Sequence, residues 1–176
     1  GFAYHCSAPE EVSGIPEEAL AAAEQAARAA GKESGWLFTL HAPSYLAYLT
    51  YCDYRPGREH LWRAFGQRGY RNDANDTRTL VAELVRLRSQ RAQLLGYATH
   101  ADFVLEERMA KSPEAVLEFL QDLANKAKPV AKREAAELRE FAAQQLQVAE
   151  LRRWDVAYAS EKMKKMRFDV DDEDLK

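Results

Sequence analysis

The chain has 176 residues, with 25 basic and 28 acidic side chains and a formal net charge of −3. This near balance of charge argues against a nucleic-acid binder. The sequence contains no run of about 18 apolar residues, the length that a membrane-spanning helix needs, so no membrane span is predicted. Two cysteines, Cys6 and Cys52, are too few for a disulfide framework and are typical of a reducing compartment. Because no basic-then-apolar leader opens the sequence, we expect a cytoplasmic protein.

The composition predicts a mostly α fold. Apolar residues make up 47% of the chain, but 30 residues are alanine, and their companions Leu, Glu, Lys, Arg and Gln all favour helices. Aromatic-rich runs predict two strands that pair as a small β element near the N-terminus, at 2–6 and 36–40. Prolines in first turns, glycines at ends and apolar spacing predict helices at 16–30, 43–54, 56–69, 77–95, 99–110, 113–146 and 155–167. We expect one multi-helix unit over residues 1–176, with a kink at Pro129.

Both ends of the sequence indicate a piece of a longer protein. Gly1 is not an initiator methionine, and residues 171–176 carry the acid-rich start of a helix without the helix. We therefore expect a fragment of a larger protein. Surface that the rest would cover predicts low solubility or self-association.

The spacing of the histidines and cysteines along the sequence does not indicate an active site. The four histidines are His5, His41, His60 and His100. No two of them have the i, i+4 spacing that places two imidazoles on one helix face for zinc, and Glu59-His60 only inverts the start of a zinc-peptidase signature. Local hydrogen bonding or packing is the favoured interpretation for all four, and Cys52 is expected to be a small buried hydrophobe. We predict no catalytic, cofactor-binding or metal-binding residue in this chain.

Two further patterns have structural interpretations. Arg86, Arg88 and Arg91 form a basic run beside Glu83, which predicts a solvated face with ion pairs rather than a phosphate site. The tyrosines recur every third residue at Tyr45, Tyr48, Tyr51 and Tyr54, and this spacing favours core or groove lining over base stacking. By residue chemistry alone, the chain is a helical domain without an active site.

Three stretches nevertheless resemble a known family, the thimet-oligopeptidase-like zinc metallopeptidases, which include oligopeptidase A and peptidyl-dipeptidase. They are Gly35–Tyr45, Leu94–Leu105 running on to Met109–Pro113, and Trp154–Tyr158 continuing through Phe168. With their order and spacing, the resemblance covers nearly the whole chain. The loop Asn72–Thr77 is more similar to the peptidyl-dipeptidase branch. Cys52-Asp53-Tyr54 departs from the Ala-Asp-Asn-like run often found in the family, so no ligand role is assigned to that turn.

The resemblance implies a helical peptidase that encloses a deep channel for short peptides. Its members carry zinc on an HExxH helix with a third glutamate ligand further on, and neither feature occurs here. The matching region lies upstream of the zinc helix, so the family's zinc is expected in the full-length parent and not in this chain. We therefore expect an inactive fragment of a zinc metallopeptidase that forms part of the channel wall. The alternative is a free-standing helical interaction module without chemistry.

Overall fold

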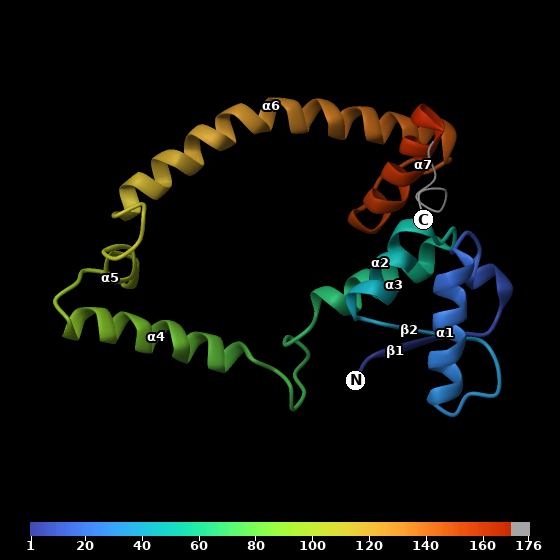
Figure 1. Ribbon diagram of the computed structural model, residues 1–176, viewed down its shortest axis with the longest axis horizontal. Coiled ribbons are helices and arrows are strands. Elements are labelled where there is room, and N and C mark those ends of the chain that lie inside the picture. Colours follow the sequence, from blue (N-terminus) through green and yellow to red (C-terminus); the bar gives the residue numbers. More distant parts are fainter. Residues whose placement is uncertain (170–176) are drawn as a thin grey trace. The chain divides into compact units, whose positions relative to one another are not determined.

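The computed structural model describes residues 1–169 and confirms a mostly helical fold with one two-stranded sheet (Figure 1). Its strands are β1 (Ala3–Cys6) and β2 (Trp36–Thr39), and its α-helices are α1 (Glu17–Ala29), α2 (Ala42–Tyr51), α3 (Arg55–Gly66), α4 (Arg78–Leu94), α5 (His100–Leu105), α6 (Pro113–Gln145) and α7 (Val156–Phe168). The acid-rich segment 171–176 lies outside the described residues. The chain divides into two compact units: unit 1 contains Gly1–Gln67 and the chain from Ala135 onward, and unit 2 contains Arg68–Glu134.

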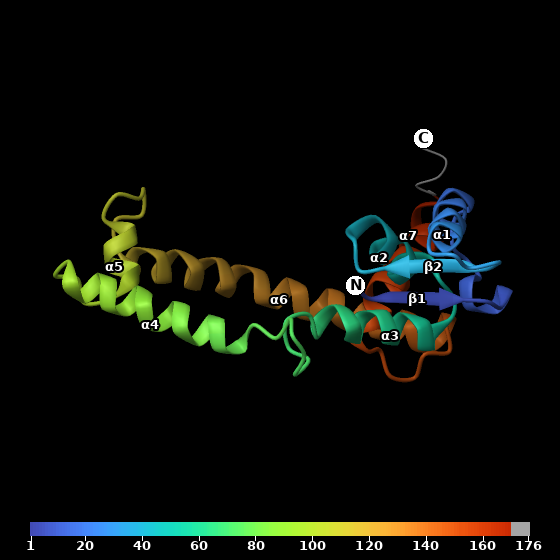
Figure 2. The same cartoon turned by 90° about the horizontal axis from the view of Figure 1, so that it is seen from below.

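Unit 1 is built around the antiparallel pair β1–β2, which lie side by side in Figure 2. The register places Tyr4 opposite Phe38 and Cys6 opposite Trp36, so these side chains share one face of the pleat. Helix α1 packs against β2. Its packing residues Ala23 and Ala27 are buried, and their small size lets the two backbones approach closely.

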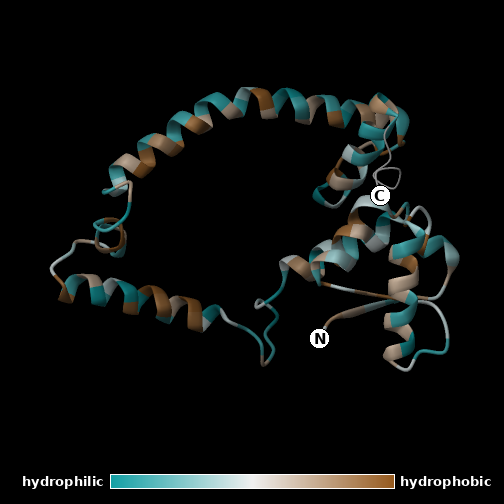
Figure 3. Cartoon of the chain, viewed as in Figure 1, coloured by the Kyte–Doolittle hydropathy of each residue, from teal (hydrophilic) through white to brown (hydrophobic). Residues whose placement is uncertain are grey.

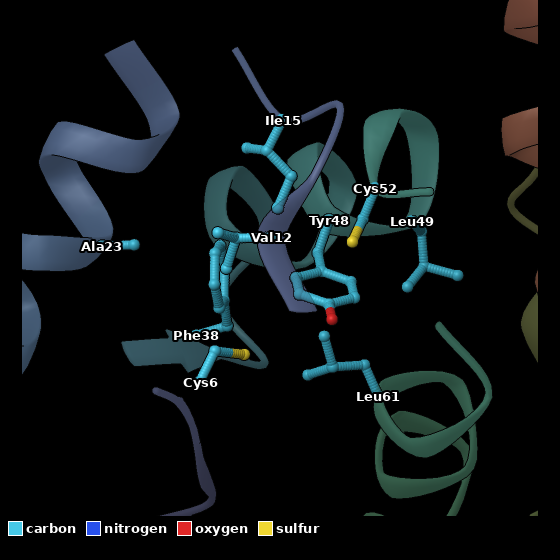
Figure 4. Packing of buried hydrophobic residues seen from close by; sticks show 9 residues of the cluster. All are labelled: Cys6, Val12, Ile15, Ala23, Phe38, Tyr48, Leu49, Cys52 and Leu61. Carbon is cyan, nitrogen blue, oxygen red and sulfur yellow. The ribbon is translucent and has the colours of Figure 1, made fainter. Parts of the chain in front are cut away.

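The core of unit 1 collects around Tyr48 of α2, which is fully buried among Phe38, Cys52 and Leu61 (Figure 4). The Tyr48 hydroxyl donates a 2.7 Å hydrogen bond to the carbonyl oxygen of Glu11, so its polar end is satisfied. The helix α3 crosses Tyr48 at Gly57, where an added Cβ would collide with the phenol ring. Glycine is therefore required here by a close approach of helix and ring.

The last part of unit 1 contains a second, smaller apolar cluster. Leu138 and Ala142 from the end of α6 pack against Ala159 of α7. These residues have the helical spacing that the sequence predicts for both segments.

Unit 2 contains α4, α5 and the part of α6 up to Glu134, and its apolar residues are largely uncovered. Helix α4 packs against α5, where Arg91 lies over the ring of Phe103, and Ala92 is the buried residue of α4. The brown bands along α4 and the first half of α6 in Figure 3 are apolar residues, and these side chains are exposed. They are Leu80, Val81, Leu84, Val85, Leu87 and Leu94 on α4, its C-cap residue Leu95, and Leu117, Phe119, Leu120, Leu123 and Val130 on α6.

Three predicted helix ends differ from the structure. Helix α5 ends at Leu105 rather than 110, where Glu106 and Glu107 would place negative charge at the negative end of the helix dipole. Helix α2 ends at Tyr51 rather than 54, because the carbonyl groups of Cys52 and Asp53 accept hydrogen bonds from an arginine side chain instead of from helix amides. Helix α3 ends at Gly66 rather than 69, and the turn that follows contains Gly69 at a positive φ of 73°. Helix α6 includes Pro129 within its length, and the kink there stays a prediction.

Candidate functional site

The most elaborate polar arrangement in unit 1 is a buried ion pair between Arg58 of α3 and Asp155, just before α7. The side chain of Arg58 is 1% exposed and that of Asp155 is fully buried. Arg58 Nη2 lies 2.9 Å from Asp155 Oδ1, although 97 residues separate them in sequence. The pair joins the first and last parts of unit 1.

Every donor of the Arg58 guanidinium that faces the interior has an acceptor. Nη1 donates to the carbonyl oxygens of Cys52 at 2.6 Å and Asp53 at 3.2 Å, and Nε donates to that of Trp154 at 3.3 Å. The guanidinium also lies 4.0 Å above the centre of the Tyr158 ring, a cation–π contact. This arginine is therefore held by three polypeptide segments at once.

The carboxylate of Asp155 likewise has all its acceptor positions occupied by hydrogen bonds. It accepts from Arg55 through Nε at 3.0 Å and Nη2 at 2.8 Å, and from the backbone N–H of Arg152 at 3.0 Å. Burial alone would raise the pKa of Asp155, but the hydrogen bonds from Arg55, Arg152 and Arg58 outweigh it and hold this pKa below its ordinary value. A carboxylate with all its acceptor positions used is not available to a substrate or a metal ion.

A second carboxylate, Asp53, extends this network to the surface. It accepts from the hydroxyls of Ser13 at 2.9 Å and Tyr158 at 2.8 Å, and Lys162 Nζ lies 3.2 Å away. Burial and then the Asp53 carboxylate raise the pKa of Tyr158 to about 12. The network fastens the α2–α3 turn to α7, and its chemistry is structural.

The four histidines are dispersed, and each has a local role. His5 Nε2 lies 2.8 Å from the carbonyl oxygen of Ser34, and His60 packs against the rings of Phe2 and Tyr4. His41 is the exposed N-cap residue of α2, and His100, the first residue of α5, lies beside Arg91 and Phe103.

Both cysteines are free and fully buried in the core of unit 1. Burial raises the pKa of Cys6 to about 12, and burial also raises the pKa of Cys52. Neither thiol is positioned to become a nucleophile, because the reactive form is the thiolate. Cys52 Sγ instead donates to the carbonyl oxygen of Glu11 at 3.3 Å.

The tyrosine series is buried or half-buried throughout. Tyr48 is in the core, Tyr45 and Tyr54 pack against that core, and Tyr45 also stacks on Phe65 at 4.4 Å between ring centres. Tyr51 lines a hollow of about 470 Å³. The hollow lies between α1, β2 and α2. Its walls are mainly apolar, with alanines from α1 and the ring of Phe38.

The three arginines of the basic run on α4 have different surroundings. Arg86 pairs with Glu83 three residues before it, at 2.5 Å, and Arg91 lies 4.9 Å from the ring centre of Phe103. Within residues 1–169, no ion pair or hydrogen bond involves the side chain of Arg88.

Residues 1–169 form no zinc site. Among the described residues, no group of three or more His, Cys, Asp or Glu side chains is placed to hold a metal ion. In the same part of the chain, no helix combines the length and apolar character needed to cross a membrane.

The fold and this structural network define a mostly helical segment in which the Trp154–Tyr158 motif contacts the α2–α3 region about 100 residues earlier in the chain. The sequence profile of "Peptidase family M3" matches residues 48–176, and the chain belongs to this family. Oligopeptidase A of Salmonella typhimurium is 43% identical over 170 residues, which are 94% of this chain and 25% of that protein. The dipeptidyl carboxypeptidase of Escherichia coli is 34% identical over 166 residues (94% and 24%), and an organellar oligopeptidase A of Arabidopsis thaliana is 30% identical over 175 (95% and 22%).

Two consequences follow from these comparisons. The resemblance to this family is confirmed, and the chain spans about a quarter of the length of the curated relatives it matches. The similarity of loop Asn72–Thr77 to the peptidyl-dipeptidase branch does not extend to the chain as a whole, since identity is higher to oligopeptidase A.

Sequence reasoning missed Arg58 and its pairing with Asp155. One signal was present: Arg55 and Arg58 both lie in the first turn of α3, at the positive end of the helix dipole, where cations are disfavoured. Two cations at that position indicate a buried or nearby carboxylate that compensates them.

Proposed function

We propose that residues 1–176 are a non-catalytic helical segment of a cytoplasmic zinc metallopeptidase that hydrolyses short peptides. The observation that carries this proposal is the family match over residues 48–176, together with relatives named oligopeptidase A and dipeptidyl carboxypeptidase. In the intact enzyme the segment forms part of the helical wall around the substrate channel.

The catalytic groups of that enzyme lie in the part of the family's polypeptide that this chain does not match. The sequence contains no HExxH, and its histidines do not converge on a common point for a metal ion. Zinc therefore belongs to the full-length parent, and the chain by itself is inactive.

The buried network of unit 1 supports a wall function. A channel wall must keep its shape when peptides enter and leave, and Arg58 and Asp155 tie three segments together through hydrogen bonds with good geometry. Since neither side chain has a free donor or acceptor directed outward, their role is to fix the scaffold.

The direct test is a peptidase assay on the purified chain. We expect no turnover of a quenched fluorescent peptide after addition of one equivalent of zinc. Turnover that is absent from metal-free samples and abolished by a chelator would show that the site lies in this chain and would refute the proposal.

The alternative function is a helical interaction module that shares ancestry with the peptidases. The exposed apolar rows of α4 and α6 favour it, because such surfaces often mark interaction sites. The reading frame of the gene distinguishes the two: continuation beyond Lys176 into an HExxH helix supports the peptidase segment, and a stop codon there supports the module.

The same rows lead to a prediction about the isolated chain. We expect it to self-associate, and we expect Leu84→Glu together with Leu120→Glu to shift light-scattering mass toward the monomer. A wild-type chain that is strictly monomeric and highly stable would contradict this expectation.

A further inference from the structure

Helix α4 carries a charged side chain in the middle of its exposed apolar face. At 100° per residue, Arg88 falls between the rows of Leu84 and Leu95 on one side and Val81 and Val85 on the other. The exposures of Leu84, Val85 and Leu95 are 46%, 61% and 55%, so this face is open in unit 2. Arg86, two residues earlier, lies on the opposite, polar face.

Within residues 1–169, the charge of Arg88 on this face has no compensating carboxylate. Arg86 has its carboxylate in Glu83, and Arg91 is directed toward α5, where it meets His100 and Phe103. The side chain of Arg88 is exposed and makes no ion pair or hydrogen bond with any residue from 1 to 169.

An apolar surface of this size is stable in water only when it is covered. Six large apolar side chains of α4 and that of its C-cap residue Leu95 are about half exposed or more. With roughly 100 Å² of exposed apolar surface for each, these side chains amount to about 700 Å². This is close to the area that one partner buries in a standard protein interface. Any segment that covers them also takes Arg88 out of water, and a buried guanidinium without a carboxylate is strongly unfavourable.

We propose that α4 docks against an amphipathic helix that presents a carboxylate to Arg88, supplied by the part of the family M3 polypeptide that this chain does not match. This inference rests on the proposed function. Two observations select the occupant: the unpaired charge requires an acidic partner, and the relatives have about three quarters of their length outside the matched segment.

A second copy of the chain fits this face less well. Helix α4 has four arginines and one glutamate, so two α4 faces would bring like charges together. On α6, Glu118 lies on the side opposite the apolar row of Val116, Leu120 and Leu123, and so points away from any helix packed on that row.

A chimera tests the inference. The 170-residue segment of Salmonella typhimurium oligopeptidase A that matches this chain is replaced by this chain, and amide hydrogen exchange of α4 is measured beside peptide hydrolysis. We expect α4 to exchange at least tenfold more slowly in the chimera than in the isolated chain.

Four variants test whether a carboxylate faces Arg88 in the chimera. In the chimera, Arg88→Glu and Arg88→Leu should each speed α4 exchange at least tenfold, because both leave a buried acid unpaired, while Arg88→Lys stays within about threefold of wild type. The matched control, Arg86→Leu on the polar face, should have no effect. In the isolated chain, Arg88→Leu should not speed exchange even where copies associate, since a second copy brings no carboxylate to Arg88.

The outcomes separate the two proposals. If Arg88→Leu behaves like Arg86→Leu in an active chimera, or if α4 is no better protected there than in the isolated chain, the inference is wrong and the proposed function stands. If α4 is protected but the chimera does not cleave peptides, the docking is supported and the proposed function fails. If protection in the isolated chain already depends on Arg88 and rises with concentration, the occupant is a second copy and the inference is wrong.

Discussion

The replacement Asp155→Ala removes the carboxylate from the buried network of unit 1 and leaves the guanidinium of Arg58, 1% exposed, without its charge partner. Breaking one side of a buried ion pair costs about 3–5 kcal/mol. Because small domains have a total stability of about 5–15 kcal/mol, this single change should bring unit 1 close to unfolding.

The assay is urea unfolding followed by tryptophan fluorescence. All three tryptophans lie in unit 1, and Trp154 is adjacent to Asp155 and packs on Trp62 with 5.6 Å between ring centres. With a denaturant slope of about 2 kcal/mol per molar urea, the transition midpoint should fall by roughly 1.5–2.5 M.

A double-mutant cycle and a surface control complete the experiment. The double variant Arg58→Met with Asp155→Leu should lose clearly less free energy of unfolding than the sum of the losses in its two single variants. In the double variant neither partner is left buried and charged. Arg28→Met, which breaks the exposed Arg28–Glu24 pair on α1, should cost less than about 0.5 kcal/mol. Equal, small effects of Asp155→Ala and Arg28→Met would refute the reasoning.

Three further predictions concern unit 1. Gly57→Ala should destabilise it by about 2 kcal/mol or more in the same urea assay, because the new Cβ meets a buried ring, whereas Gly66→Ala has open space around it and should cost nothing. Cys6 and Cys52 should react with a thiol reagent at pH 8 at least a hundredfold more slowly in the native chain than in urea; fast native labelling would contradict their burial. Since the folded-state pKa of Asp155 is lowered, its contribution to stability is fully present above the unfolded pKa of about 4 and is lost as the pH falls further. Asp155→Asn should therefore flatten the acid side of the curve of unfolding free energy against pH, and an unchanged slope would count against this assignment.

Local rules were sufficient to predict most helices and both strands. The Thr99 cap of α5 is a case in point: its hydroxyl accepts from the backbone N–H of Asp102 at 3.2 Å, and the sequence places a Thr and an Asp at the required spacing. The β1–β2 pairing also followed from two aromatic-rich runs. These features depend on neighbours within a few residues, which a sequence displays directly.

The network around Arg58 could not be predicted in this way. Its partners Cys52, Trp154 and Asp155 come from segments separated by about 100 residues, and Asp155 by itself has the character of an ordinary helix-start acid. The resemblance drew attention to the Trp154–Tyr158 motif, but only the packing of α7 beside α2 and α3 explains what its residues do.

The sequence by itself thus determined the fold class, the small sheet, the family and the scattered placement of residues capable of metal or acid–base chemistry. These conclusions rest on composition, periodicity and motif order, which are properties of the chain alone. Only the tertiary structure decided that Asp155 compensates Arg58, that Tyr48 requires a glycine at position 57, and that Arg88 lies in an open apolar face with no partner among residues 1–169. Burial and charge compensation depend on which distant residues meet, and no local pattern specifies that.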